Sequence, residues 1–438
     1  MAVDMASFDS ALKEIYKETN YNNVTMMKRP LLALLPKFKM FGGRLMPIPT
    51  QYADPQNQSA SFDRAIESGA AGAGSDQIGI SAFQLTRVSS YGICQIGTEV
   101  AEASEKDEMA FLTALKAAID GTVNSLSNRL ETQLFREGTG SIGTCGGGEA
   151  TVTFTLSETS DVANFEVGMR IVASAGVASG ASGQALIGLA AGIPVTGVNR
   201  TTGGITKGPG AWNAVGEFTA AFTSPAAGPP ATFAAHLYPV GDAAAGGDNV
   251  CVSGLGAWLP ETAPAAGAGN EFFGVDRAVD SRLYGQSFTP GAVPIEDALI
   301  DAASLSERVG GSPDLVMLHH VRMRELVKNL HNSQQYDTVN AVTHKGVVAD
   351  IGFRSVNVQT GDGKIDVVSA SRCPENTAWL LQKDTWLLAT LGEEIVELQD
   401  LDGMKIQRVY NADAVQARFR FRGNLANKGP IYNVRINF

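Results

Sequence analysis

The sequence has 438 residues, of which 44% are hydrophobic, and a formal net charge of −11. This composition is typical of folded globular protein, excludes disordered and fibrous chains, and leaves room for two or three domains. The acidic balance also argues against a general basic surface for gripping nucleic acid or anionic membrane, because that affinity is mostly electrostatic.

The cysteines and the apolar runs set further bounds. Four cysteines are scattered without a CxxC pair, so we expect buried thiols rather than disulfides or a zinc site. No apolar run approaches the ~18 residues that cross a bilayer. Residues 1–10 lack the basic start and apolar stretch of a signal peptide. We therefore expect no membrane partner and a chain that stays in the cytoplasm where it is made.

The first 86 residues predict parts that extend from a body. Residues 29–37 (RPLLALLPK) form an apolar segment between two prolines, typical of an arm that docks on another surface. Extended segments follow at 44–52 and 77–86, and prolines confine the first to a sheet edge. The loop between them has a tip, Gly69 to Gly74, of glycine and alanine only. Such a long loop is usually functional or a linker.

A single amphipathic helix is predicted from Ser104 to Arg136, about 50 Å long at ~1.5 Å per residue. Ser104 and Asp107 form an N-cap signature, and Gly138 supplies a C-terminal stop. The opposite side of the helix is polar. The apolar stripe consists of Leu112, Leu115, Ile119, Val123, Leu126, Leu130 and Leu134.

Residues 143–291 are rich in Gly, Ala, Thr and Ser and predict a separate, mostly β module. Gly146 to Gly148 lack the lysine and hydroxyl of a phosphate-binding loop, so they are interpreted as a hinge into this module. Short β-like runs lie at 151–156, 169–173, 195–198, 217–222 and 249–252.

From Pro294 the pattern alternates between helix and strand, which predicts an α/β domain of about one hundred residues. Helices are expected at 295–309 and 321–330, and strands at 315–318, 354–358, 365–368 and 378–381. Two alternating runs, 415–421 and 432–438, are separated by a turn at 427–430. They predict an antiparallel hairpin whose apolar face packs under the long helix.

No residue pattern indicates catalysis. The five histidines have no metal-ligand spacing, and GxSxG is absent. Acidic residues cluster at Glu393, Glu394 and Glu397, just before the alternating arginines Arg418, Arg420 and Arg422. A carboxylate pair could serve acid/base work, but charge complementarity between neighbouring chains is the favoured interpretation. We expect no catalytic, cofactor or metal residues.

The order of these segments resembles that of tailed-bacteriophage major capsid proteins. The resemblance rests on RPLLALLPK, GGRLMPIPTQYADPQNQSASFDRA, FQLTRVSSYGICQIGTEV, the long helix and GTGSIG. NFEVGMRIVAS, GLGAWLP and GVDRAVDSRLYGQ are similar to parts of an inserted domain in some of these proteins. The resemblance covers nearly the whole chain, although none of these strings is a diagnostic signature.

The resemblance implies an α+β phage major capsid fold with six parts. These are an N-terminal arm (1–43), an extended loop (44–92), a peripheral domain with a spine helix (93–142), an inserted β domain (143–291), an axial α/β domain (292–392) and C-terminal peripheral strands (393–438). It also implies that Asp63, Arg64 and Glu67 in the loop contact a neighbouring subunit. No lysine and asparagine pair for covalent cross-linking is identified.

The function that the resemblance implies is a shell of pentamers and hexamers that encloses double-stranded DNA without sequence-specific binding. The expected partners are further copies of the chain, a separate scaffold protein, a portal and possible decoration protein. The expected location is the virion capsid, assembled in host cytoplasm. Two alternatives stay open: an encapsulin-type nanocompartment, which shares the fold, and a carbohydrate-active enzyme whose β module binds sugar.

Overall fold

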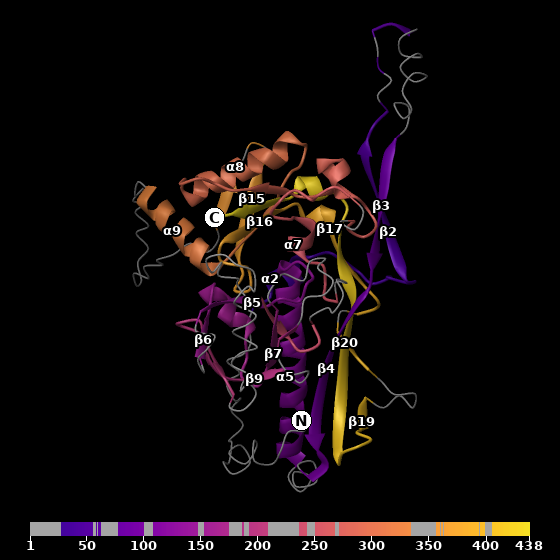
Figure 1. Ribbon diagram of the computed structural model, residues 1–438, viewed down its shortest axis with the longest axis vertical. Coiled ribbons are helices and arrows are strands. Elements are labelled where there is room, and N and C mark those ends of the chain that lie inside the picture. Colours follow the sequence, from indigo (N-terminus) through magenta and orange to yellow (C-terminus); the bar gives the residue numbers. More distant parts are fainter. Residues whose placement is uncertain are drawn as a thin grey trace, which may run out of the picture.

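The computed structural model describes residues 28–55, 58, 60–62, 78–99, 108–147, 153–174, 186–187, 192–208, 236–242, 250–267, 271–333, 356–359, 361, 363–393, 395–398 and 405–438. Within these residues the chain is an α+β protein with four sheets, as predicted. Its body is elongated along one long helix, and a two-stranded hairpin extends beyond it (Figure 1). None of the helices in these ranges combines the length and apolar character that a membrane span requires.

The long helix is confirmed as α5 (Glu108–Phe135), and the predicted cap residues 104–107 lie outside the described residues. It runs alongside strands β4 (Val88–Gly97) and β20 (Ala414–Asn427), with Leu126 packed against Phe419. Gly138, just beyond the helix end, has a φ of +87°. Glycine adopts that conformation without a Cβ clash, so the predicted stop is confirmed.

The polar side predicted for α5 is buried along much of the second half of the helix. There the polar residues are buried together with the leucines, because the N-terminal arm and the inserted module pack against them. The buried polar residues are Asn124, Ser127, Asn128, Glu131, Thr132 and Gln133.

The arm packs on the chain's own body. Helix α2 (Pro30–Leu34) lies against α5, and strand β1 (Lys37–Phe38) pairs in parallel with β17 (Trp386–Thr390). The same six-stranded sheet contains β4, β18 (Val396–Glu397), β19 (Ile406–Arg408) and β20. The described part of the arm therefore belongs to the fold of the subunit itself.

The predicted β module contains a seven-stranded sheet with its own apolar core, which includes Phe154, Phe165 and Ile205. The predicted hinge at Gly146 to Gly148 is wrong in part, because Gly146 and Gly147 lie within strand β5, and Gly148 lies outside the described residues. The strands are β5 (Gly143–Gly147), β6 (Thr153–Leu156), β7 (Arg170–Ser174), β8 (Leu186–Ile187), β9 (Ile193–Asn199), β10 (Gly204–Lys207) and β11 (His236–Pro239), with the 3-10 helix η1 (Thr159–Asn164) beside them.

No strand is described at two of the predicted β runs in this region. Residues 217–222 lie outside the described residues, and residues 250–252 are irregular rather than a strand. Cys251 and Val252 are buried, and the backbone N–H of Ser253 donates to Asn424 Oδ1 at 2.9 Å. A side-chain acceptor thus satisfies the Ser253 N–H without strand pairing.

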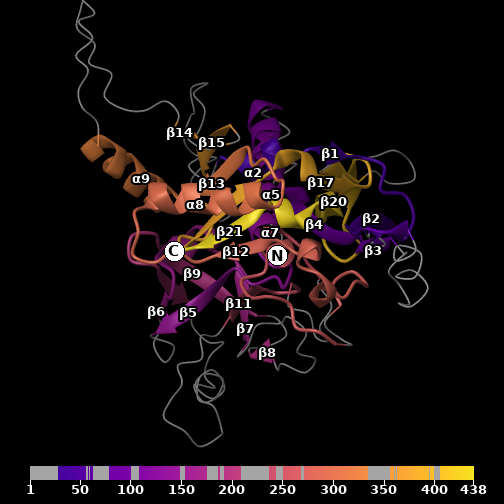
Figure 2. The same cartoon turned by 90° about the horizontal axis from the view of Figure 1, so that it is seen from above.

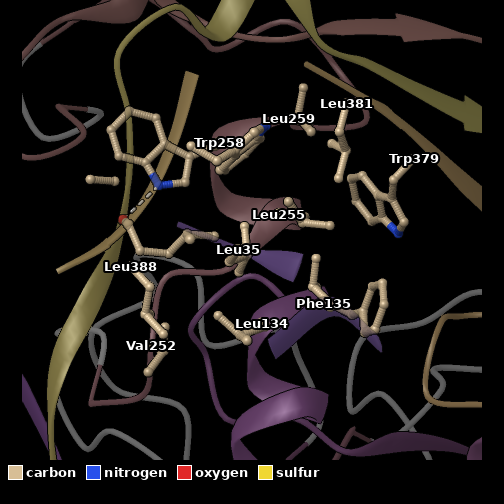
Figure 3. Close-up of a cluster of buried hydrophobic side chains, with 14 of the residues drawn as sticks. Leu35, Leu134, Phe135, Val252, Leu255, Trp258, Leu259, Trp379, Leu381 and Leu388 are labelled. Atoms are coloured by element: carbon tan, nitrogen blue, oxygen red, sulfur yellow. Dashed lines mark hydrogen bonds between the residues drawn. The ribbon is translucent and has the colours of Figure 1, made fainter. Parts of the chain in front are cut away.

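The segment that follows joins the central core instead of the β module. It contains α7 (Leu255–Trp258), η2 (Arg277–Val279) and η3 (Ser281–Leu283). Trp258 is fully buried, and its indole N–H donates to the Leu425 carbonyl at 3.0 Å. Figure 3 shows Leu35, Leu134, Leu255 and Trp379 meeting in this core from four separate parts of the chain.

The predicted axial elements are confirmed: α8 (Ile295–Arg308) and α9 (His320–Ser333) lie beside a six-stranded sheet and form one apolar cluster with it (Figure 2). The strand order is β12 (Gln286–Phe288), β21 (Val434–Asn437), β16 (Thr377–Leu381), β13 (Leu315–Leu318), β15 (Lys364–Ser369) and β14 (Val356–Gln359).

The predicted C-terminal hairpin is wrong. β20 pairs with β4 and β17, whereas β21 lies between β12 and β16 in the axial sheet. The turn η5 (Pro430–Tyr432) and the buried Asn433 separate them. Asn433 Oδ1 accepts from the Trp386 indole N–H at 2.8 Å and from the Gln382 backbone N–H at 2.9 Å, which fixes the new chain direction. The apolar face of β20 does pack against α5, as predicted.

Candidate assembly surfaces

The projecting hairpin consists of β2 (Leu45–Ala53) and β3 (Gly79–Thr86), paired antiparallel with Ile48 opposite Phe83 (Figure 1). Its pattern alternates along both strands, as expected for a sheet with one face against a core. Ile48, Phe83 and Leu85 are buried in the central cluster. The predicted pair of extended segments is therefore confirmed.

Residues between Leu255 and Leu283 contact the hairpin at several points along its strands. The Phe83 and Trp258 rings meet edge to face with centroids 5.1 Å apart. The Gln84 backbone N–H donates to the Phe273 carbonyl at 2.8 Å, and Arg282 Nη1 donates to the Tyr52 carbonyl at 2.6 Å. These contacts fix the angle at which the hairpin leaves the body.

The other face of the hairpin is exposed. Ile80 is 58% exposed and Leu45 is 42% exposed, and the prolines Pro47 and Pro49 are exposed beside them. A two-stranded hairpin with open edges is marginal in water and invites pairing or burial by another chain. The exposed face is thus suited to contact with a neighbour. The predicted contact residues Asp63, Arg64 and Glu67 lie outside the described residues.

A buried carboxylate holds the arm to the long helix. Glu131 on α5 accepts the backbone N–H groups of Leu31 at 3.0 Å and Leu32 at 2.8 Å, at the start of α2. Arg29 Nε donates to Asn128 Oδ1 at 2.9 Å. Burial raises the pKa of Glu131, although both N–H donors oppose that shift. We call this contact the Glu131 clasp. It was not predicted, and its one signal in the sequence is a glutamate next to Leu130 of the apolar stripe.

The predicted arginine face exists on β20. Arg418, Arg420 and Arg422 lie on the side of the strand that faces away from α5, opposite Ile93, Tyr91 and Ser89 of β4. Tyr91 is 50% exposed and Ile93 is 57% exposed. Arg422 Nη2 donates to the Tyr91 hydroxyl at 3.1 Å, and this bond lowers the pKa of Tyr91.

The acidic cluster pairs with lysines inside the chain. Glu393 contacts Lys39 Nζ at 2.7 Å, and Glu397 contacts Lys405 Nζ at 3.0 Å. Glu394 lies outside the described residues. Pairing of this cluster with the arginine face of another copy stays a prediction.

A cavity of about 680 Å³ lies between α5 and the β module. Two of the arginines that line it pair with carboxylates of the module: Arg129 with Asp242 and Arg136 with Asp161. These two pairs attach the module to the helix.

This attachment predicts a specific pH dependence. Burial outweighs the attraction of Arg129 and raises the pKa of Asp242 to about 6, above its ordinary 3.8. Between these two pH values the Asp242 carboxyl is ionised in the unfolded chain but still protonated in the folded chain. Stability therefore falls as pH rises through this window, by up to about 3 kcal/mol, and is level above it.

Unfolding of the wild type and of Asp242→Asn at pH 4, 5, 6 and 7 checks this. The free energy of unfolding of the wild type, relative to the variant, is expected to fall from pH 4 to 6. A difference that is constant or rises with pH would contradict it.

In the described ranges no three His, Cys, Asp or Glu side chains form a group that could hold a metal ion. The cysteines Cys94, Cys145, Cys251 and Cys373 are buried and free, as predicted. Burial raises the pKa of the Cys251 thiol to about 12, which makes it unreactive at neutral pH.

No protein-family profile and no curated protein matches the chain. Among solved structures, it is similar to a chain of the cyanophage A-1(L) capsid asymmetric unit, with 11% identity, 99% of each chain covered and a TM-score of 0.51. It is similar to a chain of Mycobacterium phage Ogopogo, with 9% identity, 100% and 99% coverage and a TM-score of 0.44.

A chain of the holo-SrpI encapsulin complex from Synechococcus elongatus has 9% identity, 100% and 95% coverage and a TM-score of 0.42. At these identities a likeness concerns the fold alone. The first likeness extends over the whole of both chains and includes the segments described above. This chain therefore has the fold of a phage capsid protein.

Proposed function

We propose that the chain is a structural shell subunit, the major capsid protein of a tailed phage. Copies form pentamers and hexamers of an icosahedral shell that encloses double-stranded DNA. The observation that carries the proposal is the full-length likeness to the cyanophage capsid chain. The virion capsid is then its location, and host cytoplasm its place of assembly.

The projecting hairpin supports this proposal. A shell subunit needs contact area with several neighbours rather than a cleft. The hairpin offers an apolar outer face that the described part of its own chain leaves exposed, including Ile80. Burial of such a face on a second copy stabilises both the hairpin and the assembly.

Charge supports the same proposal. The net charge of −11 keeps the shell wall from holding packaged DNA tightly, so DNA can be enclosed without sequence-specific binding. The arginine face of β20 then serves contacts with neighbouring chains, with the acidic cluster of Glu393, Glu394 and Glu397 as its partner. Asp63, Arg64 and Glu67 contact the adjacent subunit in the same way.

The domain layout and the other partners belong to the proposal as well. The arm, extended loop, peripheral, inserted and axial domains follow the expected order, but β12 and β21 join the axial sheet and β17 joins the sheet of β4 and β20. A separate scaffold protein and a portal assist assembly, and a decoration protein is a further possible partner.

Electron microscopy of the purified full-length protein tests the proposal. Uniform closed shells tens of nanometres wide are expected, and particles from the producing cells are expected to protect double-stranded DNA from nuclease. A persistent monomer under all assembly conditions would contradict shell formation. Shells that hold an enzyme cargo in place of DNA would assign the chain to the encapsulins.

A further inference from the structure

Two neighbouring helices of the axial domain present opposite charges to solvent. α8 and α9 bury Leu299 and Leu326 against the same sheet. On the exposed side, α8 carries Asp297 and Asp301, one turn apart. α9 carries Arg324 and Lys328, also one turn apart and exposed. We name these two surfaces the acidic face and the basic face.

Within the described residues none of these four side chains forms an ion pair, although adjacent residues do find partners. Glu296 accepts from Asn329 Nδ2 at 3.1 Å, and Arg322 pairs with Glu325 at 2.9 Å. Like charges one turn apart destabilise a helix by about 0.2–0.5 kcal/mol. The two faces therefore cost stability in the free chain, and a counter-charged surface would remove that cost.

The helix dipole does not account for the pattern. It favours Asp297 in the first turn of α8, but Asp301 lies beyond that turn. Arg324 and Lys328 both lie outside the last turn of α9, which is the part of that helix where the dipole favours a cation. Ile300, between the two aspartates, is 45% exposed.

We propose that the acidic face of α8 in one copy docks on the basic face of α9 in the adjacent copy. The inference rests on the proposed shell function and names one of its contacts. The two faces lie on two different helices of one subunit, α8 at the top and α9 at the left of the body in Figure 1. A contact between two different faces repeats from copy to copy and generates a ring.

Charge reversal in the full-length protein tests the docking. The acid-reversed variant carries Asp297→Lys and Asp301→Lys, and the base-reversed variant carries Arg324→Glu and Lys328→Glu. Each alone is expected to lower particle yield at least tenfold at about 0.1 M salt, because like charges then meet. The variant with all four substitutions is expected to recover assembly.

Mixing the two reversed variants gives a sharper result. Every contact between unlike subunits is then complementary, so the equimolar mixture is expected to form rings that neither variant forms alone. Strict alternation closes a six-membered ring but not a five-membered one, so hexamers without closed shells are expected. Glu271→Lys with Asp384→Lys, both exposed, is the control for the acid-reversed variant, because it changes the net charge by the same amount, and it should assemble normally.

The outcomes separate the two proposals. Reversed variants that assemble like the wild type would overturn the docking inference and leave the shell function intact. Failure of the fourfold variant to recover, with an unchanged thermal unfolding midpoint, would overturn it too. A wild type that forms no particles would instead overturn the proposed function.

Discussion

Replacing Glu131 with alanine is expected to lower the free energy of unfolding of the subunit by about 3 kcal/mol, since two buried N–H groups lose their acceptor. Glu131 is 1% exposed and receives the first N–H groups of α2. Alanine leaves these donors unsatisfied between arm and helix. The arm should then detach, with Leu31 and Leu32 exposed to solvent.

Glu131→Gln is the matched control. It keeps one oxygen acceptor, but its NH2 group replaces the second carboxylate oxygen and cannot accept the other N–H. It also removes the charge, which burial disfavours, as the raised pKa of Glu131 indicates. We expect a loss of about 1 kcal/mol, the typical net value of one hydrogen bond. Denaturant unfolding of unassembled subunits and proteolysis within the arm measure both variants. Equal losses for alanine and glutamine would show that the acceptor is not what holds the arm.

The second large effect is expected on assembly rather than on folding. Ile80→Asp places a carboxylate on the exposed apolar face of the hairpin, where the wild-type side chain is 58% exposed. Subunit stability should change by no more than about 0.5 kcal/mol, as for other surface substitutions. Shell yield should fall more than tenfold, because burial of an unpaired charge on a neighbour costs several kcal/mol.

Ile80→Val provides the control for this experiment, because it retains an apolar β-branched side chain at the same position. Sedimentation of assembly reactions separates shells from free subunits. If the aspartate and valine variants both assemble like the wild type, the outer face of the hairpin is not a contact surface.

The local pattern of apolar residues was sufficient to predict those elements whose structure depends mainly on residues nearby in the sequence. The 3.6-residue repeat predicted α5 and α8, and the prolyl strand with its returning partner predicted the hairpin. The buried run 315–318 was predicted at its observed bounds because an all-apolar strand directly after Gly310, Gly311 and Pro313 allows few other structures.

Long-range pairing was not predictable by the same means. β20 and β21 have matching alternation, yet they join different sheets because Asn433 fixes the chain between them. The sequence shows that one side of α5 is polar but not that this side is buried, since only the folded chain brings the arm and the β module against it. The Glu131 clasp joins residues about one hundred positions apart.

The account depends on the hairpin being buried by a second copy in the assembled state. Hydrogen exchange of the backbone amides in β3, measured in free subunits and in purified particles, tests this most directly. The account predicts that the outward edge near Ile80 exchanges much more slowly in particles, while the amide of Gln84, already bonded to Phe273, changes little. Equal exchange near Ile80 in both states would contradict it.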